Sequence, residues 1–282
     1  MPEIPEIRAH AERLDSAVGG LTLNEFKVHK FPTLKTYSPT PDELVGSTCK
    51  AVASRGKLLV FDFDKAHLVI HLMQGGRLKI VESDKAKKSR PVLAHFKFGD
   101  QEDPGLLFTE AGSERKAGIW LTSEPVEELA PLAKLGPDAD TVDLETFSSI
   151  LAEQKGRIHG VLRTQQAIAG LGRMLTNEIL HRAGLSPFAN VKKLSSKQVS
   201  SLYKAVQETV AEATEHERTL DEVGSAKDRP SKVHNRIGET CVTCDSDEVK
   251  SVEYNAYTVA YCASCQTDGK ILADNTTSKF LK

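Results

Sequence analysis

Four cysteines near the end of the chain constrain its fold more than any other feature of the sequence. They form two Cys-x2-Cys pairs separated by 17 residues, namely Cys241 and Cys244, then Cys262 and Cys265. Two such pairs at this distance place four thiolates around one Zn2+ on two β-hairpin turns. The intervening Val252–Tyr261 is rich in tyrosine and valine, as a hairpin requires. Because four cysteines close the coordination shell, we expect one structural zinc ion; chance or redox pairing is the alternative.

The fifth cysteine, Cys49, stands alone in a strand-like run and is expected to be a buried, inert thiol. An odd number of cysteines argues against a disulfide framework, which a reducing cytosol would not maintain. No apolar run approaches the roughly 18 residues that span a bilayer, and the chain start lacks the basic-then-apolar order of a signal peptide. These features predict a cytoplasmic, nucleoid-associated bacterial protein with no membrane partner.

The net charge of −2 hides one strongly basic stretch. Between residues 155 and 204 nine lysines and arginines accompany a single acid, Glu178, which gives a local charge of +8. A solvated helix surface more often alternates charges of both signs, so this stretch favours binding to several phosphates of a polyanion. The nine cations are Lys155, Arg157, Arg163, Arg173, Arg182, Lys192, Lys193, Lys197 and Lys204.

Local patterns divide the chain into a β-rich first half and a helical second half. A 3.6-residue apolar period predicts a helix over 3–18, which Gly19 and Gly20 end. Short strands separated by turn residues then predict an antiparallel sandwich or barrel. The strands are expected at Leu58–Phe63, His67–Leu72, Arg77–Val81, Val92–Phe98, Leu106–Thr109 and Gly118–Thr122.

A linker rich in proline and glycine over 123–141 leads to the helical half. Four helices are expected there. Arg173 and Asn177 lie four positions apart at the start of the third helix, so we expect them to share one face and to clamp a phosphate. The helices are predicted over Leu144–Gln154, Ile158–Ala167, Arg173–Ala183 and Ser196–Ala213.

Pro2 lies at the start of the first predicted helix, a position where proline is common for structural reasons alone. Removal of Met1 would free its secondary amine. An α-amino group has a pKa of about 7.7–8, so part of it is unprotonated at neutral pH and can attack carbon. From these residues alone, a helix-starting proline and an amine nucleophile both remain open.

Several separated segments together resemble the formamidopyrimidine-DNA glycosylase/endonuclease VIII family. They occur in the family's order over nearly the full length and include the cysteine array. The other segments are Met1-Pro2-Glu3-Ile4-Pro5-Glu6, Arg55-Gly56-Lys57, Leu135-Gly136-Pro137, Ala169–Glu178, Val233–Cys241 and Gln266. The resemblance implies a multi-domain α+β protein. Its expected parts are an N-terminal antiparallel β-sandwich with an N-terminal helix over 1–122, a linker over 123–141, a helix–two-turn–helix DNA-binding domain over 142–236, a zinc-ribbon hairpin over 237–270 and a polar tail over 271–282.

The resemblance also implies a function. It implies a monomeric base-excision-repair enzyme that binds damaged double-stranded or abasic DNA, removes oxidised bases and cleaves the strand by β- and δ-elimination. Pro2 would form a Schiff base with the sugar, Glu3 would carry protons, and Glu6 would lie in the damage pocket. Lys57 would lie near the phosphate that flanks the lesion. The DNA-binding candidates are Gln74, Lys116, His159, Arg173, Asn177 and Tyr257.

The chain departs from the family where the family reads DNA. Gln74 stands where a methionine belongs, with Met73 one place early, and Lys116-Ala117-Gly118 replaces an Arg-Phe-Gly turn. Arg173 replaces a phosphate-binding asparagine, and Tyr257 replaces an arginine at the hairpin tip. A tyrosine ring can stack on a base, but it cannot form an ion pair with a phosphate.

Three hypotheses follow from the motifs and these departures. The first is a bifunctional DNA glycosylase and AP lyase. The second is a non-catalytic or lyase-only protein that binds damaged DNA and has lost the recognition of oxidised purines. The third is a structural zinc-ribbon protein that binds a protein partner.

Overall fold

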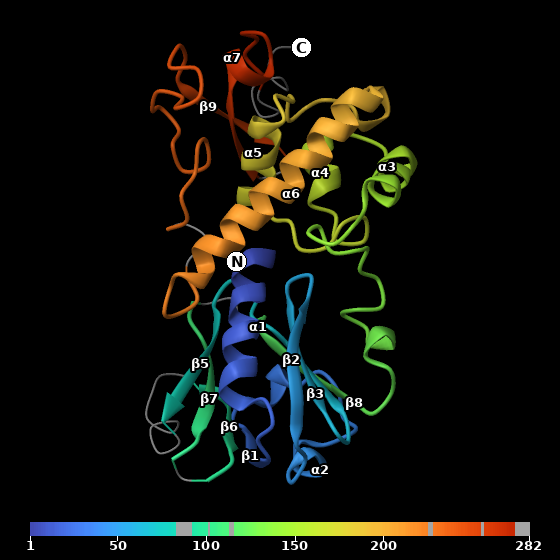
Figure 1. Cartoon of the computed structure of the whole chain (residues 1–282), viewed down its shortest axis with the longest axis vertical. Coiled ribbons are helices and arrows are strands. Elements are labelled where there is room, and N and C mark those ends of the chain that lie inside the picture. The colour runs from blue at the N-terminus through green and yellow to red at the C-terminus, as the bar shows by residue number, and fades with distance from the viewer. Residues whose placement is uncertain (83–91, 101, 113–115, 225–227, 255–256, 274–282) are drawn as a thin grey trace. The chain divides into compact units, whose positions relative to one another are not determined.

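The computed structural model divides the chain into two compact units (Figure 1). It describes all residues except 83–91, 101, 113–115, 225–227, 255–256 and 274–282. The first unit comprises Met1–Lys134 with Glu217–Ser225, and the second comprises Leu135–His216 with Ala226–Lys282. The domain boundaries expected at 122, 141, 236 and 270 are finer than this division and stay predictions. The expected polar tail over 271–282 lies outside the described residues from 274 onward.

The first unit opens with α1 (Ile4–Val18), whose apolar side is completely buried. Ile7, Leu14 and Val18 are each 0% exposed because this side of the helix contacts β2 (Cys49–Arg55) and β3 (Leu58–Phe63). Burial of an aliphatic side chain contributes about 1.5–3 kcal/mol, so the helix is held mainly by this face. The predicted helix over 3–18 is correct to one residue.

Two four-stranded antiparallel sheets complete the first unit, in the orders β1-β6-β7-β5 and β2-β3-β4-β8. Side chains from both sheets form one core, in which Phe63 and Phe98 stack with ring centroids 6.4 Å apart. The predicted antiparallel sandwich is therefore confirmed. The remaining strands are β1 (Leu23–Val28), β4 (His67–His71), β5 (Gly76–Glu82), β6 (Val92–Phe98), β7 (Pro104–Glu110) and β8 (Gly118–Thr122), and three short helices accompany them, η1 (Phe31–Thr33), α2 (Pro41–Leu44) and η3 (Val126–Glu128).

The sequence patterns missed β1. Its alternation is weak because a register shift between Leu23 and Glu25 interrupts the pairing with β6, and within the strand only Leu23 and Phe26 are buried. Strand periodicity requires several alternating positions in a row, which this strand does not offer.

The second unit is helical and ends in a hairpin. Helix α6 is its longest element, and its last two residues are grouped with the first unit. The elements are α3 (Leu144–Glu153), α4 (Ile158–Leu162), α5 (Arg173–Arg182), η4 (Val191–Lys193), α6 (Ser196–Arg218), β9 (Val249–Tyr254), β10 (Tyr257–Cys262) and α7 (Ala263–Gln266). Strands β9 and β10 pair in the antiparallel sense, as the hairpin prediction required.

Two helix predictions are wrong at their ends. The helix expected over 158–167 stops at Leu162, because the Gln165 side chain ties the following residues into a turn. Its amide nitrogen donates to the carbonyls of Arg163 and Leu171, and its amide oxygen accepts from the Gly170 backbone, which has a φ of 97°. The helix expected to end at Ala213 continues to Arg218, because residues 214–218 include good helix formers and the Glu217 side chain is buried.

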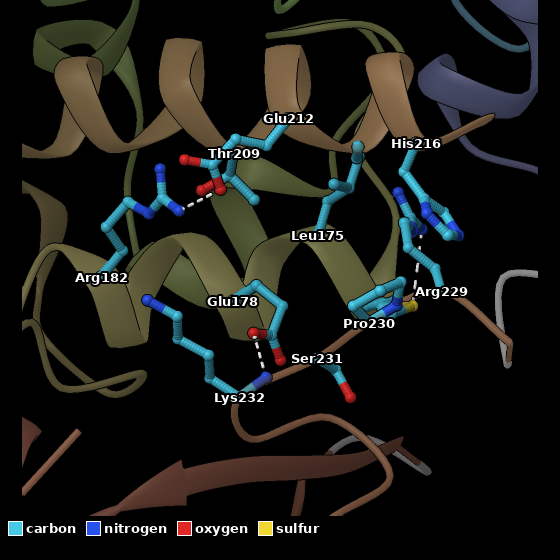
Figure 2. Close-up of a pocket in the computed structure, with 12 residues that line it drawn as sticks. Leu175, Glu178, Arg182, Thr209, Glu212, His216, Arg229, Pro230, Ser231 and Lys232 are labelled. Atoms are coloured by element: carbon cyan, nitrogen blue, oxygen red, sulfur yellow. Dashed lines mark hydrogen bonds and ion pairs between the residues drawn. The ribbon is translucent and has the colours of Figure 1, made fainter. Parts of the chain in front are cut away.

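One carboxylate holds the segment that leads into the hairpin. Glu178 of α5 accepts hydrogen bonds from the backbone nitrogens of Lys232 (2.7 Å), Val233 (3.1 Å) and His234 (2.7 Å). Figure 2 shows Glu178 directed at this segment, beside a pocket of about 210 Å3 that α5, α6 and residues 229–232 line. Arg182, on the same pocket, forms ion pairs with Glu208 and Glu212.

We expect Glu178→Ala to lower the free energy of unfolding by about 2 kcal/mol, because three backbone donors lose a charged acceptor. Glu178→Gln keeps one acceptor oxygen and should lose less. Urea denaturation followed by circular dichroism measures both changes. Glu153→Gln, an exposed position at the end of α3, serves as control and should stay within about 0.5 kcal/mol of the parent. Equal stabilities for Glu178→Ala and the control would contradict the anchoring role.

Candidate functional site

Residues 2–6 at the start of the chain are buried, and two of them cap helix α1. Pro2 is buried, Glu3 is 4% exposed and Glu6 is 0% exposed. Glu3 and Glu6 form a capping box at the N-terminus of α1, in which the Glu3 backbone nitrogen donates to Glu6 Oε2 at 2.7 Å. This arrangement satisfies backbone donors that the first helical turn leaves without partners. The ordinary capping role that two early glutamates suggest is therefore present.

Two cations face the same chain start. The Met1 amine has a pKa below its usual 8.0, chiefly because it is partly buried. The charges of Arg77 and Lys57 lower this pKa further, while Glu3 and Glu6 oppose them. The structure thus brings the predicted residues Glu3, Glu6 and Lys57 together around the amino terminus, and it adds Arg77, which the sequence did not single out.

A tight turn explains how Lys57 is placed. Gly56 has a φ of 57°, a conformation that glycine adopts without strain, and it joins β2 to β3. Lys57 follows at once and is only 7% exposed. The charge of this buried lysine acts on the amine of the chain start.

The sequence did not predict that His10 and His71 of the first unit have strongly lowered pKa values. Burial, together with the Lys57 charge, lowers the pKa of His71 to about 4, and its Nδ1 accepts a hydrogen bond from the Met73 backbone at 2.9 Å. Burial and the Arg13 charge lower the pKa of His10 to about 4. Both imidazoles are therefore neutral at physiological pH. No sequence motif marks either residue, because burial is a property of the folded chain.

A pocket of about 240 Å3 lies beside His10 in the first unit. Arg77 both lines this pocket and acts on the amino terminus, so the two sites adjoin. Lys79 and Glu222 form an ion pair of 2.8 Å at its wall. The other lining residues are His10, Arg13, Leu72, Leu78, Ile80, Asp221 and Val223.

The predicted DNA-contacting residues of the first unit lie in surface turns. Gln74 is exposed between β4 and β5, after Met73 with a φ of 53°. Lys116 is also exposed, and its backbone nitrogen donates to Glu110 Oε1 at 2.9 Å. Ala117 is 2% exposed, so it cannot act as a wedge between bases.

The phosphate clamp of Arg173 and Asn177 stays a prediction, and the structure shows that only one of its two members is exposed. Arg173 is exposed at the first turn of α5, but Asn177 is only 1% exposed. The Asn177 amide is used internally, because its Oδ1 lies 3.1 Å from His159 Nε2 and its Nδ2 lies 2.9 Å from His234 Nδ1. His159, Asn177 and His234 thus form one hydrogen-bonded chain.

His159, predicted to contact DNA, is a buried neutral group in this chain. Burial lowers its pKa to about 4, and the charges of Arg163 and Arg173 lower it as well, while the hydrogen bond that its Nε2 donates to Asn177 Oδ1 raises it. The positive charge beside this imidazole therefore belongs to the two arginines. The basic count over 155–204 included both, but it could not show that they converge.

Two arginines of the second unit stack on aromatic rings. Tyr257 is 42% exposed, and the Arg163 guanidinium lies over its ring, 3.8 Å from the centroid. Arg157 lies over Phe188 at 3.8 Å and over Tyr254 at 4.3 Å. The sequence did not predict these three contacts, since each joins residues that are far apart in the chain.

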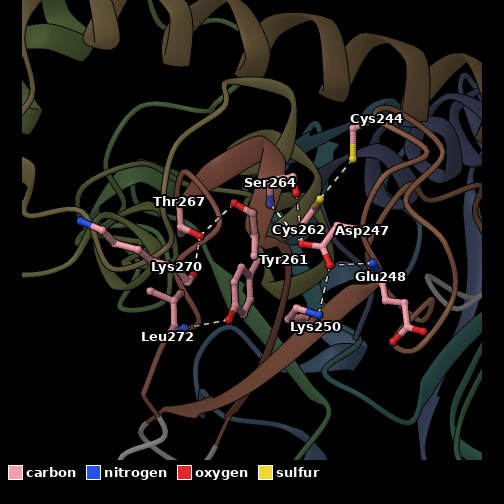
Figure 3. A network of polar contacts seen from close by, with 11 residues as sticks. Cys244, Asp247, Glu248, Lys250, Tyr261, Cys262, Ser264, Thr267, Lys270 and Leu272 are labelled. Atoms are coloured by element: carbon pink, nitrogen blue, oxygen red, sulfur yellow. Dashed lines mark hydrogen bonds and ion pairs between the residues drawn. The ribbon is translucent and has the colours of Figure 1, made fainter.

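The four cysteines of the array converge in space. Their sulfur atoms all lie within 4.8 Å of one another, and none is in a disulfide. Figure 3 shows the surrounding network, in which Asp247 contacts Lys250 at 3.1 Å and accepts from the Ser264 backbone at 3.2 Å. Gln266 accepts from the Cys262 backbone at 2.9 Å. A set of four thiolates at this spacing can hold one metal ion.

In the described part of the chain, every helix is too short or too polar to cross a bilayer.

Comparisons with known proteins agree with this architecture. Residues 1–112 match the model of the formamidopyrimidine-DNA glycosylase N-terminal domain, and residues 134–223 match the model of the formamidopyrimidine-DNA glycosylase H2TH domain. The two matches together cover more than half of the chain.

Individual relatives carry the same family name. An uncharacterized formamidopyrimidine-DNA glycosylase-like protein of Mycobacterium tuberculosis is 39% identical over 153 residues, which are 52% of this chain and 94% of that protein. The formamidopyrimidine-DNA glycosylase of Shewanella piezotolerans is 27% identical over 283 residues, with 94% of this chain and 99% of the relative covered.

A solved structure has the same fold. It is the Lactococcus lactis formamidopyrimidine-DNA glycosylase non-covalently bound to DNA that contains an AP site. Its TM-score is 0.83 at 21% identity, with 94% of this chain and 99% of that chain covered. The two family models and the 39% identical relative decide the assignment: the chain belongs to the formamidopyrimidine-DNA glycosylase family.

Proposed function

We propose that this protein is a bifunctional DNA glycosylase and AP lyase of base-excision repair, with Pro2 as its nucleophile. The observation that carries the proposal is the chain start, where a partly buried amine of lowered pKa lies among Glu3, Glu6, Lys57 and Arg77. Solved structures of the same fold include complexes with damaged or abasic DNA, so damaged DNA is the proposed partner.

The chemistry begins after removal of Met1, which leaves the Pro2 nitrogen as a secondary amine. Its lone pair attacks C1′ of the damaged nucleotide, and the bond from C1′ to the base breaks with the electron pair leaving on the base. Glu3 then protonates O4′ as the C1′–O4′ bond opens, which produces an iminium at C1′. The iminium accepts electrons when the C2′ proton is removed, so the 3′-phosphate leaves by β-elimination; loss of the 5′-phosphate follows by δ-elimination.

Each neighbouring residue has a part in this scheme. Lys57 and Arg77 favour the unprotonated amine, because a second positive charge nearby is unfavourable. They also supply cations for the phosphates of the strand being cut. Glu6 keeps the first turn of α1 in place through its bond to the Glu3 backbone.

A second function is favoured by one observation. Ala117 is small and only 2% exposed, so it cannot fill the gap left by an extruded base. Extrusion from a duplex costs a few kcal/mol of stacking. A lyase-only or non-catalytic protein that binds damaged DNA would not need to meet this cost, because an abasic site has no base to extrude.

The proline mechanism can be tested by trapping. Borohydride treatment of the enzyme with a duplex that contains an abasic site should give a covalent adduct, because hydride reduces the iminium to a stable amine. Pro2→Gly should form much less adduct, and Glu3→Gln should turn over about 10²–10⁴-fold more slowly.

Mass spectrometry of the purified protein must show that Met1 is absent. Absence of adduct from correctly processed enzyme would exclude the mechanism. Adduct formation on abasic DNA without release of oxidised purines or pyrimidines would select the lyase-only function.

The pH dependence of trapping tests the electrostatics of the chain start. Only the unprotonated amine reacts, so the trapping rate should rise with pH and level off above the amine pKa. Burial, Arg77 and Lys57 lower the pKa of the Met1 amine. We expect the same surroundings to act on the Pro2 amine once Met1 is removed, which puts the midpoint below 8.0, the ordinary value for an amino terminus.

Lys57→Gln removes one of the cations and should move this midpoint to higher pH, whatever its effect on the maximal rate. Lys65→Gln is the matched control. Lys65 is exposed in the turn after β3, at the opposite strand end from Lys57, and its removal should leave the midpoint unchanged. A Lys57→Gln midpoint equal to that of the parent would contradict the assigned electrostatics.

We also propose that the metal held by the four cysteines is a single structural Zn2+. Four thiolates suit Zn2+ and leave no open position for a substrate. His181 supports the site, since its Nε2 lies 3.4 Å from Cys241 Sγ and can donate to the thiolate.

Elemental analysis should find one zinc per chain, and Cys262→Ser should lose it together with thermal stability of the hairpin. Cys49→Ala is the control, because Cys49 is buried elsewhere and burial raises the pKa of its thiol to about 12. That variant should keep its zinc. A full zinc content in Cys262→Ser would exclude the four-cysteine site.

A further inference from the structure

The Arg163 guanidinium lies on the ring of Tyr257, at the hairpin. Arg163 directly follows the last residue of α4, and Tyr257 is the first residue of β10. Within the part of the chain that the structure describes, this guanidinium contacts the ring face of Tyr257 and forms no hydrogen bond or ion pair. A guanidinium has five N–H donors, so its hydrogen-bonding capacity remains available to a ligand.

Other arginines of the same unit are committed to the protein. Arg182 is paired with Glu208 and Glu212. Arg157 is enclosed by two rings, those of Phe188 and Tyr254, at 3.8 and 4.3 Å. Arg163 differs from both, because it rests on a single ring that is itself 42% exposed.

A second cation lies near the same point. Arg163 and the exposed Arg173 both lower the pKa of the buried imidazole of His159, so both guanidinium groups are within electrostatic reach of one residue. Because His159 is neutral at physiological pH, the charge that this surface offers to an anion comes from the two arginines. A row of cations is the feature that binds successive phosphates of a nucleic acid backbone.

We propose that Arg163 binds a DNA backbone phosphate and that Tyr257 is the positioning residue that holds it at the hairpin. The inference rests on the proposed function, because it presumes that DNA is the ligand. Arg163, which directly follows α4, supplies at the hairpin the positive charge that Tyr257 cannot provide. Arginine is suited to the task, since its planar group stacks on an aromatic face while its edge donates two parallel hydrogen bonds to a phosphate.

This placement changes the expected role of Tyr257. The sequence allowed its ring to stack on a base, but the Arg163 guanidinium covers one face of that ring. The favourable interaction of a cation with the face of a tyrosine ring requires the guanidinium to stay within about 6 Å of the centroid. Tyr257 therefore acts through Arg163, and the two residues should behave as one unit in binding.

The test is the salt dependence of binding to a duplex that contains a tetrahydrofuran abasic analogue, measured by fluorescence anisotropy between 50 and 200 mM KCl. Loss of one phosphate contact flattens the slope of log K against log[KCl] by about 0.9. Arg163→Ala should show this flattening, with binding about eightfold weaker at 0.1 M KCl from counterion release alone. Lys65→Gln changes an exposed lysine of the first unit that has no assigned DNA contact, and it should leave slope and affinity unchanged.

A double-mutant cycle separates positioning by Tyr257 from stacking on a base. Tyr257→Phe keeps the ring and should bind as the parent does. Tyr257→Ala should weaken binding in the parent but add little in the Arg163→Ala background, because the residue acts through Arg163. Arg163→Ala combined with Tyr257→Arg should regain the steeper slope, since the cation returns to the hairpin.

Thermal melting of each variant checks that the fold is retained. An unchanged salt slope in folded Arg163→Ala would overturn the inference, as would additive losses in the cycle, which would indicate base stacking. If the parent forms the borohydride adduct while Arg163→Ala binds normally, only this inference fails. If the parent neither binds abasic DNA nor forms the adduct, the proposed function fails and this inference fails with it.

Discussion

The hydrogen bond from the Glu3 backbone to the Glu6 carboxylate is the constraint on which the proposed chemistry depends. It lies in a fully buried first turn, so the start of α1 cannot fray without exposing the sandwich core to water. The chain start before this turn lies within reach of Lys57 and Arg77, whose charges help to lower the pKa of the Met1 amine. A terminal amine is ordinarily the most mobile group of a protein, and here the capping of one helix makes it a positioned group.

The second unit uses a buried hydrogen-bonded chain in a similar way. His159, Asn177 and His234 join α4, α5 and the segment before the hairpin, while Glu178 binds the backbone of that segment. These polar groups satisfy one another inside the protein, while of the two arginines that act on His159, Arg173 is exposed and Arg163 is half-buried. The hydrogen-bonded chain is therefore distinct from the arginines that can bind a polyanion.

The departures from the family's DNA-reading residues have different consequences in the two units. In the first unit, Gln74 and Lys116 are exposed in turns, whereas Ala117 is small and buried, so only the bulk of an aromatic side chain is missing there. In the second unit, the loss of a hairpin arginine is accompanied by a new neighbour, since Arg163 stacks on Tyr257. A site can keep its charge when the residue that carries it changes, provided that the geometry places another cation there.

The sequence by itself determined the cysteine array, the boundaries of α1 to one residue and the antiparallel sandwich. These depend on spacing and periodicity, which are local properties of a chain. It could not determine β1, where a register shift weakens the alternation, nor the end of α4, where the Gln165 side chain closes a turn. Only the tertiary structure decided that Asn177 is buried, that His159 is neutral and that Arg163 meets Tyr257. Burial and contacts between distant segments arise when the chain packs, and desolvation and cation–π attraction act only at the distances that packing creates.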